Sequence, residues 1–294
     1  MKISAKLKYN DVVGSLARKY YDIRASALEK VIFTATTGRS GTLTLTKLFA
    51  TVPDCLSLHE PYPIMNGRVL RAASSGDLRS AGKRYFQVKA VCIRRAAIRY
   101  RYYMEANHLF IKSFVEAAAS DFRDRMEIVH LVHSPLSVAN SIYRLDEFPG
   151  TPRGNYWWLD YRAPTNRVQI VDLLEQDKRY SHPFFRCLWY WFEVEARVQD
   201  WRTRLPEVRF HRFETPWFND SRRVHGLLRD LGIRYDPEAI EARVGKREHV
   251  REEQKRLDAV PPELAREMLE SFEEALRARG YGYLDCFPGS HSST

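Results

Sequence analysis

Residues 34–49, TATTGRSGTLTLTKLF, constrain the fold more than any other stretch of the sequence. They continue from VIFTA (31–35), a short apolar run that is typical of a strand buried on both faces. Small polar residues and two glycines come next, and then Leu45, Leu48 and Phe49 recur at helical spacing. The order of strand, glycine-containing loop and helix predicts a βα unit whose loop lies at the carboxyl end of its strand.

The rest of the chain repeats this alternation. Apolar runs predict further strands at 85–91, 127–132 and 208–213. Apolar periodicity with capping residues predicts helices over 114–122, from Pro135 onward, over 183–201, over 222–231 and over 262–279. Strands that alternate with helices predict an α/β fold with a mainly parallel sheet flanked by helices on both faces.

A length of 294 residues is compatible with one large domain, and we expect a single domain over 1–294. Residues 1–29 are basic and are expected to form an N-terminal helix, with amphipathic periodicity over 11–29. The stretch 148–167 is rich in Pro, Gly and aromatic residues and reads as a long functional loop. Residues 285–294 read as a flexible tail.

The composition is basic, with 47 Lys and Arg against 37 Asp and Glu and a formal net charge of +10. A basic surface attracts anions such as nucleic acid, acidic lipid or a phosphorylated cofactor. The sequence contains no zinc-finger spacing or RNA-recognition signature, so we expect no nucleic-acid partner. The basic segment 1–29 allows peripheral contact with a membrane surface. The scattered cysteines and the lack of an apolar leader or membrane span predict a cytoplasmic protein.

The glycine-containing loop has the layout of a phosphate site but not the residues of a nucleoside triphosphatase. Such an enzyme needs Gly-Lys followed by Ser or Thr, whereas residues 38–42 read Gly-Arg-Ser-Gly-Thr. No aspartate follows the strand 127–132 to hold magnesium. We therefore expect backbone amides, hydroxyl groups and the planar guanidinium of Arg39 to hold an anion without a metal ion.

A second strand-to-helix turn lies in HLVHSPLSVANSIYRL (130–145). Ser134 is a candidate N-cap with proline at the first helical position, and His133 ends the strand. Ser141 and Arg144 follow within the first turns of the helix and are suited to a second anion. An ordinary βα turn with a capping serine remains the alternative.

Together these turns resemble the sulfotransferase family. TTGRSGT resembles the family's 5′-phosphosulfate loop, and HLVHSPLSVANSIY resembles its 3′-phosphate motif, with the His133 to Ser141 spacing of that motif. The segment 208–233 resembles the family's later strand and helix. The resemblance implies a P-loop-NTPase-like α/β fold and the metal-independent donor 3′-phosphoadenosine 5′-phosphosulfate (PAPS). It implies donor-binding roles for Thr37, Gly38, Arg39, Ser40, Gly41, Thr42, Leu43, His133 and Ser141.

One departure from the family pattern concerns the 3′-phosphate. The family's arginine is His133 here, and we expect Arg144 to supply the missing guanidinium. The alternative is an altered 3′ site and a different donor. The family closes this site with a late basic loop, a role open to Arg243, Lys246 and Arg247 unless they form a solvated charge run.

Sulfuryl transfer needs a cation at the leaving phosphate and a base for the acceptor hydroxyl. The resemblance implies that Arg39 is this cation and that Glu60, in SLHEPYP (57–63), is the base. His59 is the alternative base, and a purely structural turn before Pro61 also remains open.

The acceptor is expected under the 148–167 loop. The aromatic residues Tyr156, Trp157, Trp158 and Tyr161 are candidates for an acceptor platform, and Glu105, His108 and Lys112 are candidate contacts. The Arg-type loop and Glu-type base resemble the carbohydrate and bacterial branch, which implies a carbohydrate or glycolipid acceptor. The competing hypotheses are a P-loop kinase that uses ATP and magnesium, and a basic module that binds nucleic acid or membrane.

Overall fold

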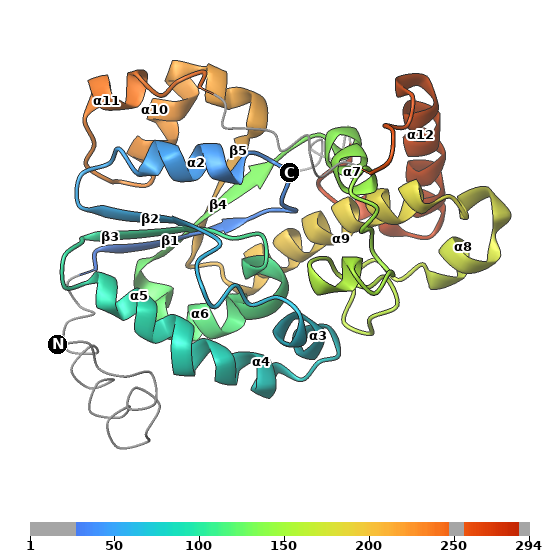
Figure 1. Cartoon of the computed structure of the whole chain (residues 1–294), viewed down its shortest axis with the longest axis horizontal. Coiled ribbons are helices and arrows are strands. Elements are labelled where there is room, and N and C mark those ends of the chain that lie inside the picture. The colour runs from blue at the N-terminus through green and yellow to red at the C-terminus, as the bar shows by residue number, and fades with distance from the viewer. Residues whose placement is uncertain (1–27, 247–255, 288–294) are drawn as a thin grey trace.

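The computed structural model describes residues 28–246 and 256–287 (Figure 1). Five parallel strands form one sheet in the order β2-β3-β1-β4-β5. Their bounds are Lys30–Ala35 for β1, Cys55–His59 for β2, Tyr102–Ala106 for β3, Met126–Val132 for β4 and Arg209–Glu214 for β5. The predicted α/β fold with a parallel sheet flanked by helices is confirmed.

Helices cover both faces of the sheet (Figure 1). One face carries α2 (Thr42–Phe49), α10 (Ser221–Asp230) and α11 (Pro237–Glu241). The other carries α3 (Arg68–Ser74), α4 (Leu78–Arg84), α5 (Ala90–Ala96) and α6 (Val115–Phe122). A further group at the right in Figure 1 contains α7 (Pro135–Tyr143), α8 (Val171–Gln176), α9 (Pro183–Arg204) and α12 (Pro262–Ala278). Shorter helical segments are η2 (Tyr85–Lys89), η3 (Phe110–Phe114), η4 (Arg123–Arg125), η5 (Gly154–Tyr156), η6 (Lys178–Tyr180), η7 (Thr215–Asn219) and η9 (Tyr281–Tyr283).

The central strand β1 shows why the sheet is covered on both faces. Val31, Phe33 and Ala35 belong to the core beneath one face, and Ile32 belongs to the core beneath the other. All four side chains are fully buried. Successive strand residues point to opposite faces, so an uninterrupted apolar run requires helices on both sides. Each large aliphatic or aromatic side chain buried in this way contributes roughly 1.5–3 kcal/mol.

The strand predicted at 85–91 is wrong, because this stretch is helical and continues through η2 into α5. Tyr85, Val88 and Lys89 are buried, whereas Phe86 and Gln87 are exposed. That spacing of three and four residues is helical, and five apolar or long side chains in a row obscured it. Strands β2 and β3 were not predicted, because neither has an uninterrupted buried apolar run. β2 is only half-buried, and β3 contains a charged residue, Glu105.

Glu105 is wholly buried and forms an ion pair with Lys89. The Lys89 Nζ lies 2.5 Å from Glu105 Oε1, and the Tyr103 hydroxyl and Asn107 Nδ2 donate to the same carboxylate at 2.5 and 2.8 Å. Lys89 Nζ also lies 3.4 Å from the carbonyl oxygen of Pro61. A buried charge is tolerated only when it is paired and hydrogen-bonded, and this network also fixes the chain that follows β2.

The predicted N-terminal helix falls largely on residues outside the described part of the chain, and residues 28–29 are not helical. In the predicted tail, residues 285–287 are packed on the domain, because Asp285 pairs with Arg202 and Phe287 is buried. Residues 288–294 and Arg247 lie outside the described residues. Among the helices of residues 28–246 and 256–287, none is both long and apolar enough to span a bilayer.

Candidate active site

The loop between β1 and α2 lies close to its neighbours at both of its glycines. Gly38 and Gly41 have φ values of 81° and 86°, which L-residues rarely adopt. A Cβ on Gly38 would lie 3.2 Å from His108, and one on Gly41 would lie 3.1 Å from Phe218. Arg39 also has a positive φ, 58°, which is strained for a residue with a side chain. The loop is thus pressed between the end of β3 and η7.

Side-chain hydroxyl groups hold the carbonyl groups of this loop. The Tyr190 hydroxyl donates to the carbonyl oxygen of Thr37 at 2.6 Å, and the Thr215 hydroxyl lies 2.8 Å from that of Ser40. Helix α2 begins without a side-chain cap and with no acidic residue in its first turn. The first amides of a helix have no partner within it and carry the positive end of its dipole. With its carbonyl groups held and its first turn uncapped, the loop is suited to an anion.

Arg39 joins the loop to the second predicted anion-binding turn. Its Nε donates to the Ser141 hydroxyl on α7 at 2.8 Å, across 102 residues of sequence. Ser134 caps α7 by accepting from the Ser137 amide at 3.2 Å, with Pro135 at the first helical position. His133 directly follows β4, and its Nδ1 accepts from the Ser134 amide at 2.9 Å. The two turns therefore lie side by side at the carboxyl edge of the sheet.

A groove of about 600 Å³ runs along α7 from Leu136 to Arg144 and includes Ser141. Arg144 lines it, one helical turn beyond Ser141, and its Nε lies 3.4 Å from the Leu257 carbonyl oxygen. Arg266 of α12 lines the same groove and adds a guanidinium that no sequence motif predicted here. Arg243 and Lys246 lie elsewhere, beside η7, where the Gly245 amide donates to the Phe218 carbonyl at 2.9 Å.

The two candidate bases lie at the end of β2, next to the loop. His59 is exposed, and its Nε2 lies 3.0 Å from the Thr42 hydroxyl at the start of α2. Glu60 follows with a φ of 45°, and its amide donates to the Ala106 carbonyl at the end of β3. The Glu60 side chain is 25% exposed, and its Oε1 lies 3.6 Å from His108 Nε2. The Glu60 carboxylate is therefore partly exposed to solvent and faces the buried His108 ring.

Beneath the loop lies a buried polar cluster of His108, Lys112 and Tyr190. Lys112 Nζ lies 2.6 Å from His108 Nδ1 and 2.5 Å from the Tyr190 hydroxyl. Burial, and then the charges of Lys112, His59 and Arg39, lower the pKa of His108 well below its usual value. Burial also lowers the pKa of Lys112 well below its usual value, although Glu60 offsets part of this. His108 is therefore uncharged at neutral pH.

These positions refine the candidate acceptor contacts. His108 and Lys112 lie under the loop, but Glu105 lies inside the sheet, engaged by Lys89. Tyr190 carried no sequence signal, because it is one of several aromatic residues in α9 and its partner Thr37 is 153 residues away. Only the fold brings that pair together.

The aromatic residues of the 148–167 loop divide into two groups. The ring of Trp158 lies 5.2 Å from that of His108, and the ring of Trp157 lies 6.4 Å from it. Within the described residues, the buried indole Nε1 of Trp158 has no hydrogen-bond partner. Tyr156 is exposed, whereas Tyr161 is buried in the core and donates to Glu175 at 2.9 Å. Tyr161 therefore does not contribute to the acceptor platform that the sequence predicted for it.

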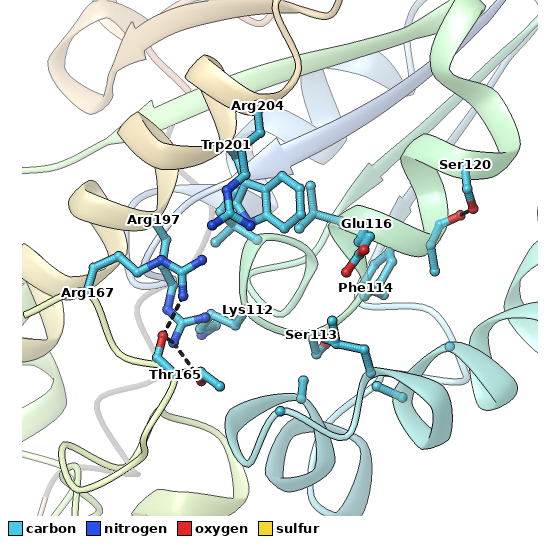
Figure 2. Close-up of a pocket in the computed structure, with 18 of the residues that line it drawn as sticks. Lys112, Ser113, Phe114, Glu116, Ser120, Thr165, Arg167, Arg197, Trp201 and Arg204 are labelled. Carbon is cyan, nitrogen blue, oxygen red and sulfur yellow. Dashed lines mark hydrogen bonds between the residues drawn. The ribbon is translucent and has the colours of Figure 1, made fainter.

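A second pocket, of about 450 Å³, is lined in part by Lys112 (Figure 2). Arg167, Arg197 and Arg204 line it together with Trp201 and Phe114. Carboxylates offset most of this charge, because Glu193 lies 2.6 Å from Arg197, and Asp200 bonds to both Arg167 and Arg204. Glu116 also lines the pocket, so it is less suited to an anion than the loop. In the described part of the chain, no cluster of three His, Cys, Asp or Glu residues has the arrangement of a metal site.

Searches against protein-family models and curated proteins found no match. Among solved structures, the chain is similar to the sulfotransferase domain from the Synechococcus PCC 7002 olefin synthase, with 15% identity and a TM-score of 0.47, over 83% of this chain and 94% of that one. It is similar to the sulfotransferase domain from the curacin biosynthetic pathway at 15% identity and a TM-score of 0.46, over 85% and 91% of the two chains. Similarity at this level carries no argument about function, which must rest on the residues of the site.

Proposed function

We propose that this protein transfers a sulfuryl group from PAPS to the hydroxyl group of an acceptor. One observation carries the proposal: the guanidinium of Arg39 bonds to Ser141 of α7. This contact joins the turn that resembles a 5′-phosphosulfate loop to the turn that resembles a 3′-phosphate motif. Two anion-binding turns side by side match a donor with phosphate groups on both the 5′ and 3′ positions.

The donor half of the site would be built on β1 and β4. The 5′ phosphosulfate would lie on the amides of the loop and the uncapped start of α2. The 3′-phosphate would lie near Ser141 and Arg144, in the groove along α7. During transfer an acceptor oxygen bonds to sulfur as the bond from sulfur to the phosphate oxygen breaks. Arg39 would stabilise the negative charge that develops on that leaving oxygen.

Glu60 is the best placed base for the acceptor proton. Its carboxylate is partly exposed beside the loop, so a hydroxyl group can reach it. His108 is almost fully buried, with one ring nitrogen against Lys112 and the other facing Glu60. His59 is more exposed, but its Nε2 is engaged by the Thr42 hydroxyl. In this arrangement Glu60 takes the proton, and His108 orients the Glu60 carboxylate.

The acceptor would enter beside Trp157 and Trp158, which lie over His108. Aromatic faces suit sugar rings as well as apolar alcohols, and we propose a carbohydrate or glycolipid. Radiolabelled PAPS tested against a panel of simple glycosides, oligosaccharides and glycolipids would identify the best acceptor. Transfer to small phenols alone would contradict the proposed acceptor class without affecting the donor.

Binding of the desulfated product, 3′-phosphoadenosine 5′-phosphate, is expected to be independent of magnesium and to weaken at least about tenfold in Arg39→Ala. The reason is that a hydrogen bond to a charged group contributes about 1.5–3 kcal/mol. Isothermal titration calorimetry with and without magnesium measures both effects. Arg222→Ala, on the exposed side of α10, is the control. Magnesium-dependent ATP binding would instead support a kinase, and salt-sensitive binding of nucleic acid without nucleotide would support a binding module.

Arg144→Ala is expected to weaken binding of the same nucleotide by about ten- to a hundredfold, through loss of a charge-assisted bond to the 3′-phosphate. Adenosine 5′-phosphosulfate lacks that phosphate, so its affinity should be unchanged in the variant. Calorimetry with both ligands makes the comparison. Equal losses for the two ligands would show that Arg144 does not contact the 3′-phosphate. Arg266→Ala tests the second guanidinium of the groove in the same way.

A further inference from the structure

The buried cluster beneath the loop has a hydrogen-bond direction that its two ends determine. At one end the carbonyl oxygen of Thr37 can only accept, so the Tyr190 hydroxyl donates its single hydrogen there, at 2.6 Å. The Tyr190 oxygen must then accept from Lys112 Nζ, at 2.5 Å. Lys112 is therefore the donor in this half of the cluster.

At the other end the Glu60 carboxylate can only accept when ionised, and it faces His108 Nε2. The 3.6 Å separation is longer than a hydrogen bond, as is common for catalytic pairs without substrate. His108 is uncharged because burial and neighbouring cations lower its pKa, so its ring carries one hydrogen. With that hydrogen on Nε2, Nδ1 is an acceptor and matches Lys112 Nζ at 2.6 Å. Both branches thus run outward from Lys112.

Burial of the Lys112 amine is energetically unfavourable. Lys112 is 2% exposed, and within residues 28–246 and 256–287 its amine has an imidazole and a hydroxyl at hydrogen-bond distance. Removing an amine from water in this way is unfavourable, and an apolar residue would fill the same space. Its neighbours Trp158 and Tyr190 place their rings 5.6 and 5.0 Å from the amine. A buried lysine of this kind beside a candidate base indicates a functional role.

We propose that Lys112 is a positioning residue that fixes the tautomer of His108, so that Nε2–H orients Glu60, and that through Tyr190 it keeps the Thr37 carbonyl turned away from the bound anion. The effect on turnover rests on the proposed function, whereas the hydrogen-bond pattern does not. The Lys112 amine bonds to His108 and Tyr190, so its proposed effect on donor and acceptor is indirect. It connects the loop that would hold the anion to the residue that would take the proton.

Nitrogen-15 NMR of the His108 ring tests the pattern without any ligand. The signals are assigned by their loss in His108→Asn. We expect protonated Nε2 and unprotonated Nδ1 in the wild-type protein, and a mixture of the two tautomers in Lys112→Met. Protonated Nδ1 in the wild-type protein would overturn the proposal, whatever the protein's activity proves to be. Tyr190→Phe should leave the His108 tautomer unchanged, because it removes only the other branch.

A double-mutant cycle tests the effect on turnover, with radiolabelled PAPS and the best acceptor of the panel. Lys112→Met is expected to lower kcat by about ten- to a hundredfold, the size of effect that misplacement of a reacting group produces. In a Glu60→Gln background the same change should alter kcat less than about threefold, because the base it positions is absent. Equal losses in both backgrounds would show a merely structural role and overturn the proposal.

Lys112→Gln keeps the result interpretable if the methionine variant does not fold. Its amide retains two N–H donors, so we expect the wild-type His108 tautomer and a kcat closer to that of the wild-type protein. A glutamine variant that folds, as shown by its melting temperature, but has the Nδ1–H tautomer would contradict donation from residue 112. Lys83→Met, at an exposed position of α4, controls for loss of a lysine.

Discussion

Glu60→Gln is expected to lower kcat for sulfuryl transfer by about 10²- to 10⁴-fold, the usual contribution of a general base. Glutamine has nearly the same shape as glutamate but cannot take the proton of the acceptor hydroxyl. The carboxylate lies beside the loop rather than within it, so binding of 3′-phosphoadenosine 5′-phosphate should change less than about threefold. Steady-state kinetics with the best acceptor and calorimetry with the nucleotide measure the two effects.

Two further variants make this result decisive. Glu238→Gln, at an exposed position of α11, should retain wild-type kcat. His59→Ala removes the rival base and its bond to Thr42. Near-normal turnover in Glu60→Gln together with a large loss in His59→Ala would transfer the role of base to His59.

Lys89→Met is expected to lower the free energy of unfolding by about 3–5 kcal/mol, because it leaves a carboxylate buried without its partner. Glu105 is wholly buried, and Lys89 lies 2.5 Å from it. The hydrogen bonds from Tyr103 and Asn107 remain but do not neutralise the charge. Urea denaturation followed by circular dichroism gives the free energy and shows from its slope whether unfolding stays two-state.

Lys83→Met is the matched control, and it should change stability by less than about 0.5 kcal/mol because its side chain is exposed. The double variant Lys89→Met, Glu105→Gln removes both charges and keeps an oxygen for the Tyr103 hydroxyl. It should be more stable than Lys89→Met alone. A single variant within about 1 kcal/mol of the wild-type protein would show that the carboxylate reaches water or is protonated.

The sequence predicted those elements of the fold whose burial pattern is simple. β1, β4 and the long helix α9 follow from uninterrupted apolar runs or strong periodicity, and their boundaries agree within a few residues. The pattern failed where one charged residue is buried, as in β3, and in the short, half-buried strand β2. The other edge strand, β5, was predicted. Burial of Glu105 depends on Lys89, which reaches it from a different element. A local pattern cannot contain that information.

The candidate site divides in the same way. The loop residues could be named because they are contiguous and their residue types suit an anion. The contact of Arg39 with Ser141 spans 102 residues, and it follows from the parallel order of β1 and β4 once both turns lie at one edge. The role of Lys112 and Tyr190 could not be predicted, because it depends on two side chains from η3 and α9 meeting under the loop. Spacing along the chain says nothing about such a meeting.

The position of β2 at the rim of the sheet has a consequence for how such a protein can diversify. Under the proposed function, recognition of the invariant nucleotide depends on the interior strands β1 and β4, which have neighbours on both sides. The proton acceptor follows β2, which among the strands of the described residues pairs with β3 alone. Substitutions near β2 can therefore change which alcohols the acceptor site binds, while the donor-binding half of the site stays intact.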